Sequence, residues 1–442
     1  MNKIIKLVIL IIFLNNCSFD NKTGIWTGSD VVTKKKDNEN QNLELIFTKK
    51  NSIIKAKELS SKQTLNLENP KSFSSWDERY QNKFNNVGNI SFSNVGNYKK
   101  YSKISRSTVN NNILISDNNL FFSDFKGNIG VFSLTQNQLI FEFNFYKKKL
   151  KNVRKDINLI IVDGTIIAAD NFGYIYSIDY KKNKLNWAKN FLVPFRSNLK
   201  TLNGVLFLTD EKNKIVLIDV KNGNKIDELY TQPSKTVSKF ENNLVIDDKN
   251  NLIFLSTSGS LYSLNLSNQK TINWIQNFKP ENEIVFSANP VAISNDQVMV
   301  STSNSISLVN INGARVWDKS IKSAISPVIS GNTIFTINRD NYLILIDRNT
   351  GEIIYSKNIY SLLAKDFKKN FQKKIKKIDH IYIIGNKLLL VSNNSYFIEV
   401  DLKDTINISS IKKNPFDISS DVLFVKNEMI FIGNSGRIYK VN

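Results

Sequence analysis

The sequence predicts an all-β fold: an eight-bladed β-propeller with four-stranded antiparallel blades, closed by pairing of its N- and C-terminal strands. Two observations predict it. One short motif returns eight times along the chain, and an aromatic residue follows most copies at a similar distance. A period of about 45 residues is too long for a single hairpin and suits a four-stranded blade.

Each copy of the motif starts with Gly or Asn, continues with alternating apolar residues and often ends with Asp or Asn. Alternation along a strand sends successive side chains to opposite faces, so that each strand can contact both neighbouring blades. Gly and Asn tolerate the positive φ angles of the tight turns between strands. The copies begin at Gly127, Gly173, Asn213, Gly259, Asn304, Asn341, Asn394 and Gly436, at spacings of 37 to 53 residues.

The recurring aromatic residue lies about 14 residues after the start of a copy, and three of the five tryptophans occupy this position. Such regularity favours packing between successive blades over ligand stacking. Asp residues at equivalent positions in different blades are likewise expected to hold turns rather than to form one site. The aromatic residues are Phe141, Trp187, Trp274, Trp317 and Tyr355, and the acidic residues are Asp179, Asp219, Asp347 and Asp401.

The two ends of the chain are expected to share one blade. The eighth copy stops at Asn442, directly after its third strand. The strand-like segment 98–104 precedes the first complete blade and has the length and position to supply the missing fourth strand. Pairing the termini in this way would close the ring without a free sheet edge.

Composition excludes several classes of function. The net charge is +21, but the lysines are spread along the chain and no nucleic-acid-reading motif accompanies them, so no nucleic-acid partner is expected. Cys17 is the single cysteine and His380 the single histidine. Internal disulfides, cysteine zinc sites and multi-histidine metal sites are therefore excluded.

The N-terminus is typical of a targeting signal. Positions 7–14 are all apolar, which is too short to span a bilayer and suits a secretory signal peptide over residues 1–16. The sequence from Leu14 to Cys17 resembles the bacterial lipobox, which implies lipid attachment at Cys17; the alternative is an ordinary signal peptide with an incidental cysteine. Ser18 then implies sorting to the outer membrane. Residues 17–70 are polar and poorly periodic, and we expect a tether before a propeller spanning 71–442.

One stretch breaks the repeat. Between copies six and seven, residues 361–377 place Leu363, Phe367, Phe371 and Ile375 four positions apart and hold seven lysines. The spacing predicts a short amphipathic basic helix in a loop between blades. Its lysines either contact an anionic surface or lie in water on a helix packed against the propeller, and the second interpretation is preferred.

The repeat, Gly-x-apolar-x-apolar-x-Asp followed by a turn Gly and a Trp, resembles that of the quinoprotein (PQQ-like) β-propellers. With the lipoprotein signal and eight blades, the whole chain resembles the outer-membrane lipoproteins of the β-barrel assembly machinery. That resemblance implies binding to the periplasmic domains of the barrel-inserting subunit and support for insertion of outer-membrane proteins. It implies a lipid-anchored protein facing the periplasm, one copy per hetero-complex.

The same resemblance places partner contacts in two regions. Leu192, Phe195 and Arg196 lie in one expected inter-blade loop, and Glu241 and Asn243 lie in the next blade. An arginine beside aromatic and aliphatic residues is also a usual composition of a protein–protein hot spot. Glu241 keeps the acidic character expected there, whereas Asn243 has lost it.

Two other functions stay open. A PQQ-dependent dehydrogenase on this scaffold would carry a Ca²⁺ site, an Asp base and a vicinal cysteine pair, and the chain has no second cysteine. No cofactor, no metal and no catalytic residue are therefore expected. A generic periplasmic adhesion or scaffold propeller with another partner is the remaining alternative, because a fold does not fix a function.

Overall fold

The computed structural model describes residues 17–19, 26–28, 54–60, 63–93, 95–146, 150, 152–233, 241–266, 271–280, 283–366, 373–403 and 405–442. The chain divides into two units, Met1–Ile53 and Ile54–Asn442. In the first, β1 (Cys17–Phe19) pairs antiparallel with β2 (Trp26–Gly28). The expected signal peptide lies outside the described residues, as does most of the expected tether before residue 54. Among the described residues, no helix is long and apolar enough to cross a membrane.

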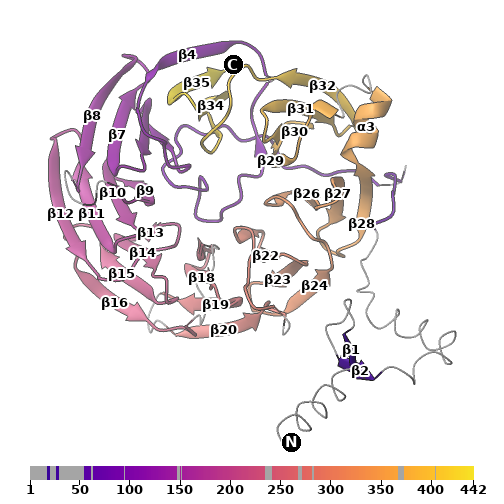
Figure 1. Ribbon diagram of the computed structural model, residues 1–442, viewed down its shortest axis with the longest axis horizontal. Helices are drawn as coiled ribbons and strands as arrows, with labels where there is room; N and C mark the ends of the chain where they lie inside the picture. Colours follow the sequence, from indigo (N-terminus) through magenta and orange to yellow (C-terminus); the bar gives the residue numbers. More distant parts are fainter. Residues whose placement is uncertain are drawn as a thin grey trace, which may run out of the picture. The chain divides into compact units, whose positions relative to one another are not determined.

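The second unit is a ring of eight blades within the described residues, and in blades 1–7 the strands run from the axis outward in chain order (Figure 1). In blade 8 the outermost strand is instead the first of the four in the sequence. Blade 1 holds β5 (Leu114–Ser116), β6 (Asn119–Ser123), β7 (Asn128–Ser133) and β8 (Gln138–Asn144); blade 2 holds β9 (Ile157–Val162), β10 (Thr165–Asp170), β11 (Tyr174–Asp179) and β12 (Lys184–Asn190). Blade 3 holds β13 (Lys200–Leu202), β14 (Val205–Thr209), β15 (Ile215–Asp219) and β16 (Lys225–Leu229); blade 4 holds β17 (Asn243–Ile246), β18 (Asn251–Leu255), β19 (Ser260–Asn265) and β20 (Ile272–Asn277).

The second half of the ring repeats this arrangement, with an extra short strand in blade 7 and an outer strand from the N-terminal part of the chain in blade 8. Blade 5 holds β21 (Ala292–Ser294), β22 (Gln297–Ser301), β23 (Ile306–Asn310) and β24 (Arg315–Lys319); blade 6 holds β25 (Val328–Ser330), β26 (Thr333–Ile337), β27 (Tyr342–Asp347) and β28 (Ile353–Asn358). Blade 7 holds β29 (Ile378–Ile384), β30 (Lys387–Ser392), β31 (Tyr396–Asp401) and β32 (Asn407–Lys413), with the short β3 (Asn89–Ile90) added parallel to β29. Blade 8 holds β33 (Leu423–Val425), β34 (Glu428–Ile432), β35 (Arg437–Val441) and β4 (Tyr98–Lys103).

Blade 8 confirms the predicted closure of the ring. The C-terminal strand β35 pairs antiparallel with β4, with Val441 opposite Tyr98 and Arg437 opposite Lys103. The two strands lie side by side where the two ends of the propeller meet (Figure 1). The sheet edge that either terminus alone would leave open is therefore paired.

The recurring aromatic residues pack between blades, as the repeat predicts. The indole nitrogens of Trp187, Trp274 and Trp317 donate to backbone carbonyls of the next blade, at 3.0, 2.8 and 2.7 Å. Each indole also covers a turn glycine of that blade, where a Cβ atom would lie 2.3–2.7 Å from a ring atom. The glycines are Gly223, Gly313 and Gly351, all at positive φ. A side chain at these positions would push the two blades apart.

The repeated acidic residues hold turns. The carboxylates of Asp179, Asp219 and Asp347 accept hydrogen bonds from backbone N–H groups two or three residues later, at 2.7–3.0 Å. Asp401 instead lies 3.8 Å from the ammonium of Lys387. Local side-chain bonds of this kind are why Asp favours tight turns.

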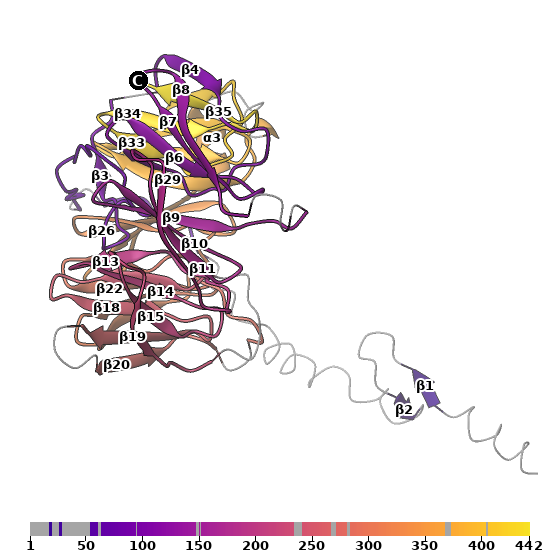
Figure 2. The same cartoon turned by 90° about the vertical axis from the view of Figure 1, so that its left-hand side faces the viewer.

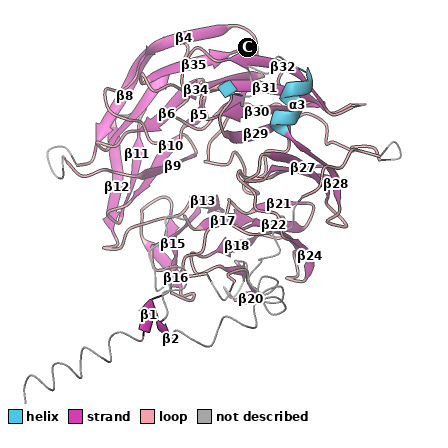
Figure 3. Ribbon diagram, turned by 45° about the vertical axis from the view of Figure 1, so that its right-hand side comes forward, coloured by secondary structure: helices cyan, strands magenta, loops and turns pink. Residues whose placement is uncertain are grey.

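The predicted basic helix is found in part. Helix α3 (Ile359–Asp366) lies against β28 and β32, beside the outer edge of blades 6 and 7 (Figure 3). Leu362, Leu363 and Ile375 are buried in the cluster shared by these blades. Residues 367–372 lie outside the described residues, residues 373–374 are helical, and residues 375–377 are not.

The two faces of the ring are distinct. On one face lie the hairpins that join the first and second strands of each blade; we call it the strap face. On the other, the loop face, lie the connections from one blade to the next. In an antiparallel meander these connections alternate between the faces. The compact unit begins at Ile54, earlier than the expected boundary at residue 70, because residues 54–70 already contact blade 6.

Candidate functional site

Residues 66–90, here called the strap, run around the axis on the strap face (Figures 1 and 2). The strap bonds first to blade 6, where the Glu68 amide donates to Ser330 at 3.0 Å. It then meets the remaining blades in their order around the ring and ends at β29 of blade 7. The contacts that follow run from blade 8 to blade 7: Phe73 O with Lys426 N, Trp76 with Ile115, Asp77 O with Ile161 N, Glu78 with Lys200, Lys83 O with Ile246 N, Phe84 O with Ile293 N, Asn86 with Ile329, and Asn89 with Ile383.

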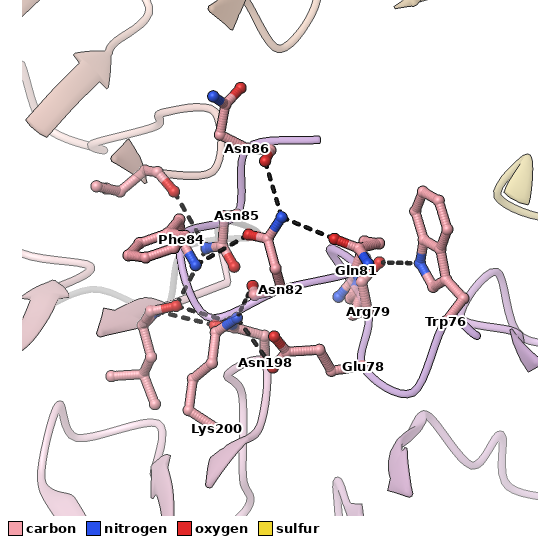
Figure 4. Close-up of polar contacts among 12 residues, drawn as sticks. Trp76, Glu78, Arg79, Gln81, Asn82, Phe84, Asn85, Asn86, Asn198 and Lys200 are labelled. Carbon is pink, nitrogen blue, oxygen red and sulfur yellow. Dashed lines mark hydrogen bonds and ion pairs between the residues drawn. The ribbon is translucent and has the colours of Figure 1, made fainter. Parts of the chain in front are cut away.

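The strap therefore bonds to all eight described blades, at the innermost strand in blades 1–7 and at the hairpin after β33 in blade 8. Most of these bonds use backbone groups of the strap at 2.6–3.2 Å. Side-chain bonds to the blades are added by Asn85 and Asn86, whereas the side chain of Asn82 accepts from the Phe84 amide within the strap (Figure 4). The strap thus forms a floor across the axis of the ring.

Three ion pairs join the strap to blades 3 and 4, and the most exposed of them joins Lys83 to Asp248 at 3.3 Å. The ammonium of Lys200, whose side chain is 1% exposed, lies 3.0 Å from Glu78 Oε2 and donates to Asn82 O at 2.7 Å (Figure 4). Burial lowers the pKa of Lys200, and Glu78 acts against this by favouring the charged form. The second pair joins Arg79 of the strap to Glu241.

The expected partner-contact residues lie at the start of blades 3 and 4. Arg196 is half-buried in the connection between β12 and β13, and its carbonyl accepts a hydrogen bond from the Asn242 amide at 2.9 Å. The Asn242 side chain is buried and donates to Thr209 and to the carbonyl of Asp210, at 2.8 and 3.1 Å. The Arg196 and Glu241 segments are thus tied together, as the expected site requires.

The five residues differ in accessibility. Leu192 is 84% exposed at the tip of its connection, whereas Phe195 is 5% exposed and packs edge-on against Phe191. Asn243 is buried and donates to the carbonyl of Glu241 at 2.9 Å. The side chains of Phe195 and Asn243 therefore lie beneath this surface in the structure and are not exposed on it. As partner contacts all five stay predictions.

Glu241 forms an ion pair with Arg79 of the strap. Since the pair is partly exposed, replacing Arg79 by Ala is expected to cost about 2 kcal/mol of unfolding free energy. Adding Glu241→Ala should cost little more, because Glu241 has then already lost its partner. Urea unfolding of the two single variants and the double variant measures this coupling. Fully additive losses would show that the pair does not act as a unit.

The loop face carries a series of exposed apolar tips. They lie in four successive connections, from blades 1–2 to blades 4–5, and the first of these projects from the ring on the side away from the strap (Figure 2). Leu150 and Leu192 also have positive φ, 54° and 62°, a conformation that is unfavourable for leucine. The exposed tip residues are Leu150, Val153, Leu192, Tyr230, Ile284 and Val285.

A cavity of about 520 Å³ lies on the axis above the strap. Trp76, Arg79 and Tyr80 line it from the strap, and His380 and Asp421 line it from blades 7 and 8. Among the described residues, no three His, Cys, Asp or Glu side chains gather as a metal site would require.

Residues 151–357, which form blades 2–6, match the family model described as "Outer membrane protein assembly factor BamB". The resemblance expected from the PQQ-like repeat is therefore found over these blades. No curated protein matches the chain by sequence.

Solved structures share the fold of this chain. BamB from Moraxella catarrhalis is 10% identical, with a TM-score of 0.59 over 78% of this chain and 98% of its own. The quinohemoprotein alcohol dehydrogenase from Comamonas testosteroni is 8% identical, with a TM-score of 0.62 over 83% of this chain and 80% of its own. The computationally designed Ika8 protein is 11% identical, with a TM-score of 0.56 over 77% and 98%. At these identities the likeness shows the fold alone.

Proposed function

We propose that this chain is a non-catalytic scaffold lipoprotein of the outer-membrane β-barrel assembly machinery. It binds the periplasmic domains of the barrel-inserting subunit, supports insertion of outer-membrane proteins, and is held at the outer membrane by a lipid on Cys17. The match of blades 2–6 to the BamB family supports this role. The single observation that carries the binding site is Leu192, exposed at the tip of an inter-blade connection next to Arg196.

The strained backbone conformation of Leu192 favours a functional role for this residue. An exposed leucine at positive φ gains nothing from burial and loses free energy to backbone strain, of order 1–3 kcal/mol. The same combination recurs at Leu150, one connection away. Apolar tips rimmed by polar residues are typical of protein–protein contact surfaces. We infer that the partner docks on the loop face along blades 1–5.

A scaffold also fits the acidic residues better than an enzyme does. The carboxylates of Asp179, Asp219 and Asp347 are used by turns in separate blades. The dehydrogenases that share the fold are the reason to keep the catalytic alternative, and spectroscopic assay of the purified chain for bound quinone tests it. A scaffold with another partner is the third possibility.

Replacing Leu192 by Asp is expected to weaken binding of the barrel-inserting subunit at least about tenfold, because it places a charge in the centre of the docking surface. Co-purification from detergent-solubilised outer membranes measures this. The matched control is Ile226→Asp, an apolar residue that is 46% exposed on the outer strand of blade 3. The control should co-purify as the unmodified chain does.

The outcomes separate the function from the site. If the unmodified chain does not bring down the barrel-inserting subunit, the proposed function is wrong. If Leu192→Asp and Arg196→Glu both co-purify at the unmodified level, the function stands and the site is elsewhere on the ring.

A further inference from the structure

The axial cavity contains a carboxylate without a counter-ion. Asp421 lies in the connection between β32 and β33 and lines the cavity. Its amide donates to Asn111 O at 3.0 Å, which fixes the backbone. Its carboxylate accepts no hydrogen bond and forms no ion pair with any residue that the structure describes. Burial raises the pKa of Asp421, while Arg79 and His380 act in the opposite direction.

The neighbouring cations are already paired. The guanidinium of Arg79 is bound to Glu241, and the ammonium of Lys377 lies 3.9 Å from Asp379. Glu241 does not itself line the cavity, but with it included these two positive and two negative groups cancel, and an ionised Asp421 leaves one net negative charge at the cavity. The rest of the chain is strongly basic, with a net charge of +21. The cavity therefore attracts a cation in a protein whose surface repels cations.

The walls are aromatic. Trp76, Tyr80 and Tyr382 line the cavity, and the guanidinium of Arg79 already lies 5.4 Å from the centre of the Tyr80 ring. The ring of His380 lies 6.1 Å from that of Tyr382 at an interplanar angle of 20°. Burial raises the pKa of Tyr80 to about 12, so its phenol is neutral at physiological pH. Aromatic faces around a carboxylate are the environment that organic ammonium and guanidinium groups prefer.

We propose that the axial cavity binds a small organic cation, a primary amine or guanidinium, as the counter-ion of Asp421. The carboxylate supplies the charge and hydrogen-bond acceptors, and the aromatic walls cover the alkyl chain. The strap forms the floor of this site, so the ligand enters from the loop face. The site is separate from the tips at Leu150 and Leu192, and it does not depend on the proposed partner.

Isothermal titration calorimetry of the full chain in detergent tests this with putrescine as the probe and 1,4-butanediol as its uncharged match. Putrescine is expected to bind and butanediol is not. Asp421→Asn should weaken putrescine binding about tenfold or more, the usual effect of losing a charged hydrogen bond. Asp417→Asn is the matched control, an exposed aspartate in the same connection that does not line the cavity.

A second variant and thermal melts show whether weaker binding results from misfolding. Tyr382→Leu removes an aromatic wall while Asp421 stays, and it should weaken putrescine binding several-fold. Asp421→Asn should melt at or above the temperature of the unmodified chain, since it removes an uncompensated charge. Equal putrescine binding by Asp421→Asn overturns the proposal. So does the absence of any binding, or binding of calcium chloride but not of putrescine.

Discussion

Replacing Glu78 by alanine is expected to lower the free energy of unfolding by about 3–5 kcal/mol, because it leaves a buried ammonium without its counter-ion. Lys200 is almost fully enclosed and keeps only the carbonyl of Asn82 as an acceptor once Glu78 is gone. Desolvation then acts on an unpaired charge. Guanidinium unfolding at neutral pH measures the loss.

A surface pair provides the control for this experiment. Asp156 and Arg154 are both more than half exposed and lie 2.6 Å apart, so Asp156→Ala should cost less than about 1 kcal/mol. The double variant Glu78→Leu with Lys200→Met removes both charges together and should recover much of the loss. Equal stability of Glu78→Ala and the unmodified chain would mean that the strap does not hold blade 3.

Replacing Trp317 by alanine is expected to cost about 3–5 kcal/mol, the usual range for a large buried aromatic residue. The indole fills the contact between blades 5 and 6, covers Gly351 and donates to Arg348 O at 2.7 Å. Its removal leaves both a cavity and an unpaired carbonyl. Thermal and guanidinium unfolding report the change.

A variant of the neighbouring residue distinguishes a loss of packing between blades from a loss of strand propensity. Val316 lies on the same strand, β24, but is exposed. Val316→Ala should therefore change stability by less than about 1 kcal/mol. A comparable loss in both variants would place the effect in the strand and not in the contact between blades.

The sequence was sufficient for the ring because the ring repeats. Eight copies of one motif reveal the blades, and the tryptophans mark the contacts between them. The closing strand could also be predicted, since a last blade that ends at Asn442 lacks one strand and the segment 98–104 is free to supply it. Each inference rests on side-chain patterns that recur at a fixed distance.

The strap could not be predicted in the same way. It follows a circle whose partners change at every blade, so its residues show neither strand nor helix periodicity. Most of its bonds use backbone groups, as at Asp77, Lys83 and Phe84, which any residue possesses. One weak signal was present: Trp76 to Arg79 places an aromatic residue beside three charged ones in a segment that precedes the first expected strand.

The candidate site shows a similar limit. The sequence placed Leu192, Phe195 and Arg196 in one connection but did not reveal that Phe195 turns inward while Leu192 turns outward. Glu241 was identified through the family resemblance, yet its partner Arg79 lies 162 residues earlier in the chain. Residues so far apart in the sequence form no local pattern from which their contact could be predicted.

The pairing of β4 with β35 also determines when the ring can form. Arg437 donates to the carbonyl of Tyr101 across 336 residues, and the strap bonds to blades made early and late in synthesis. A nascent chain that has not yet reached β35 cannot complete blade 8. Contacts this distant in sequence slow folding, because the entropy of loop closure must be overcome before they form. We therefore expect completion of the propeller to be a slow step that follows synthesis of β35.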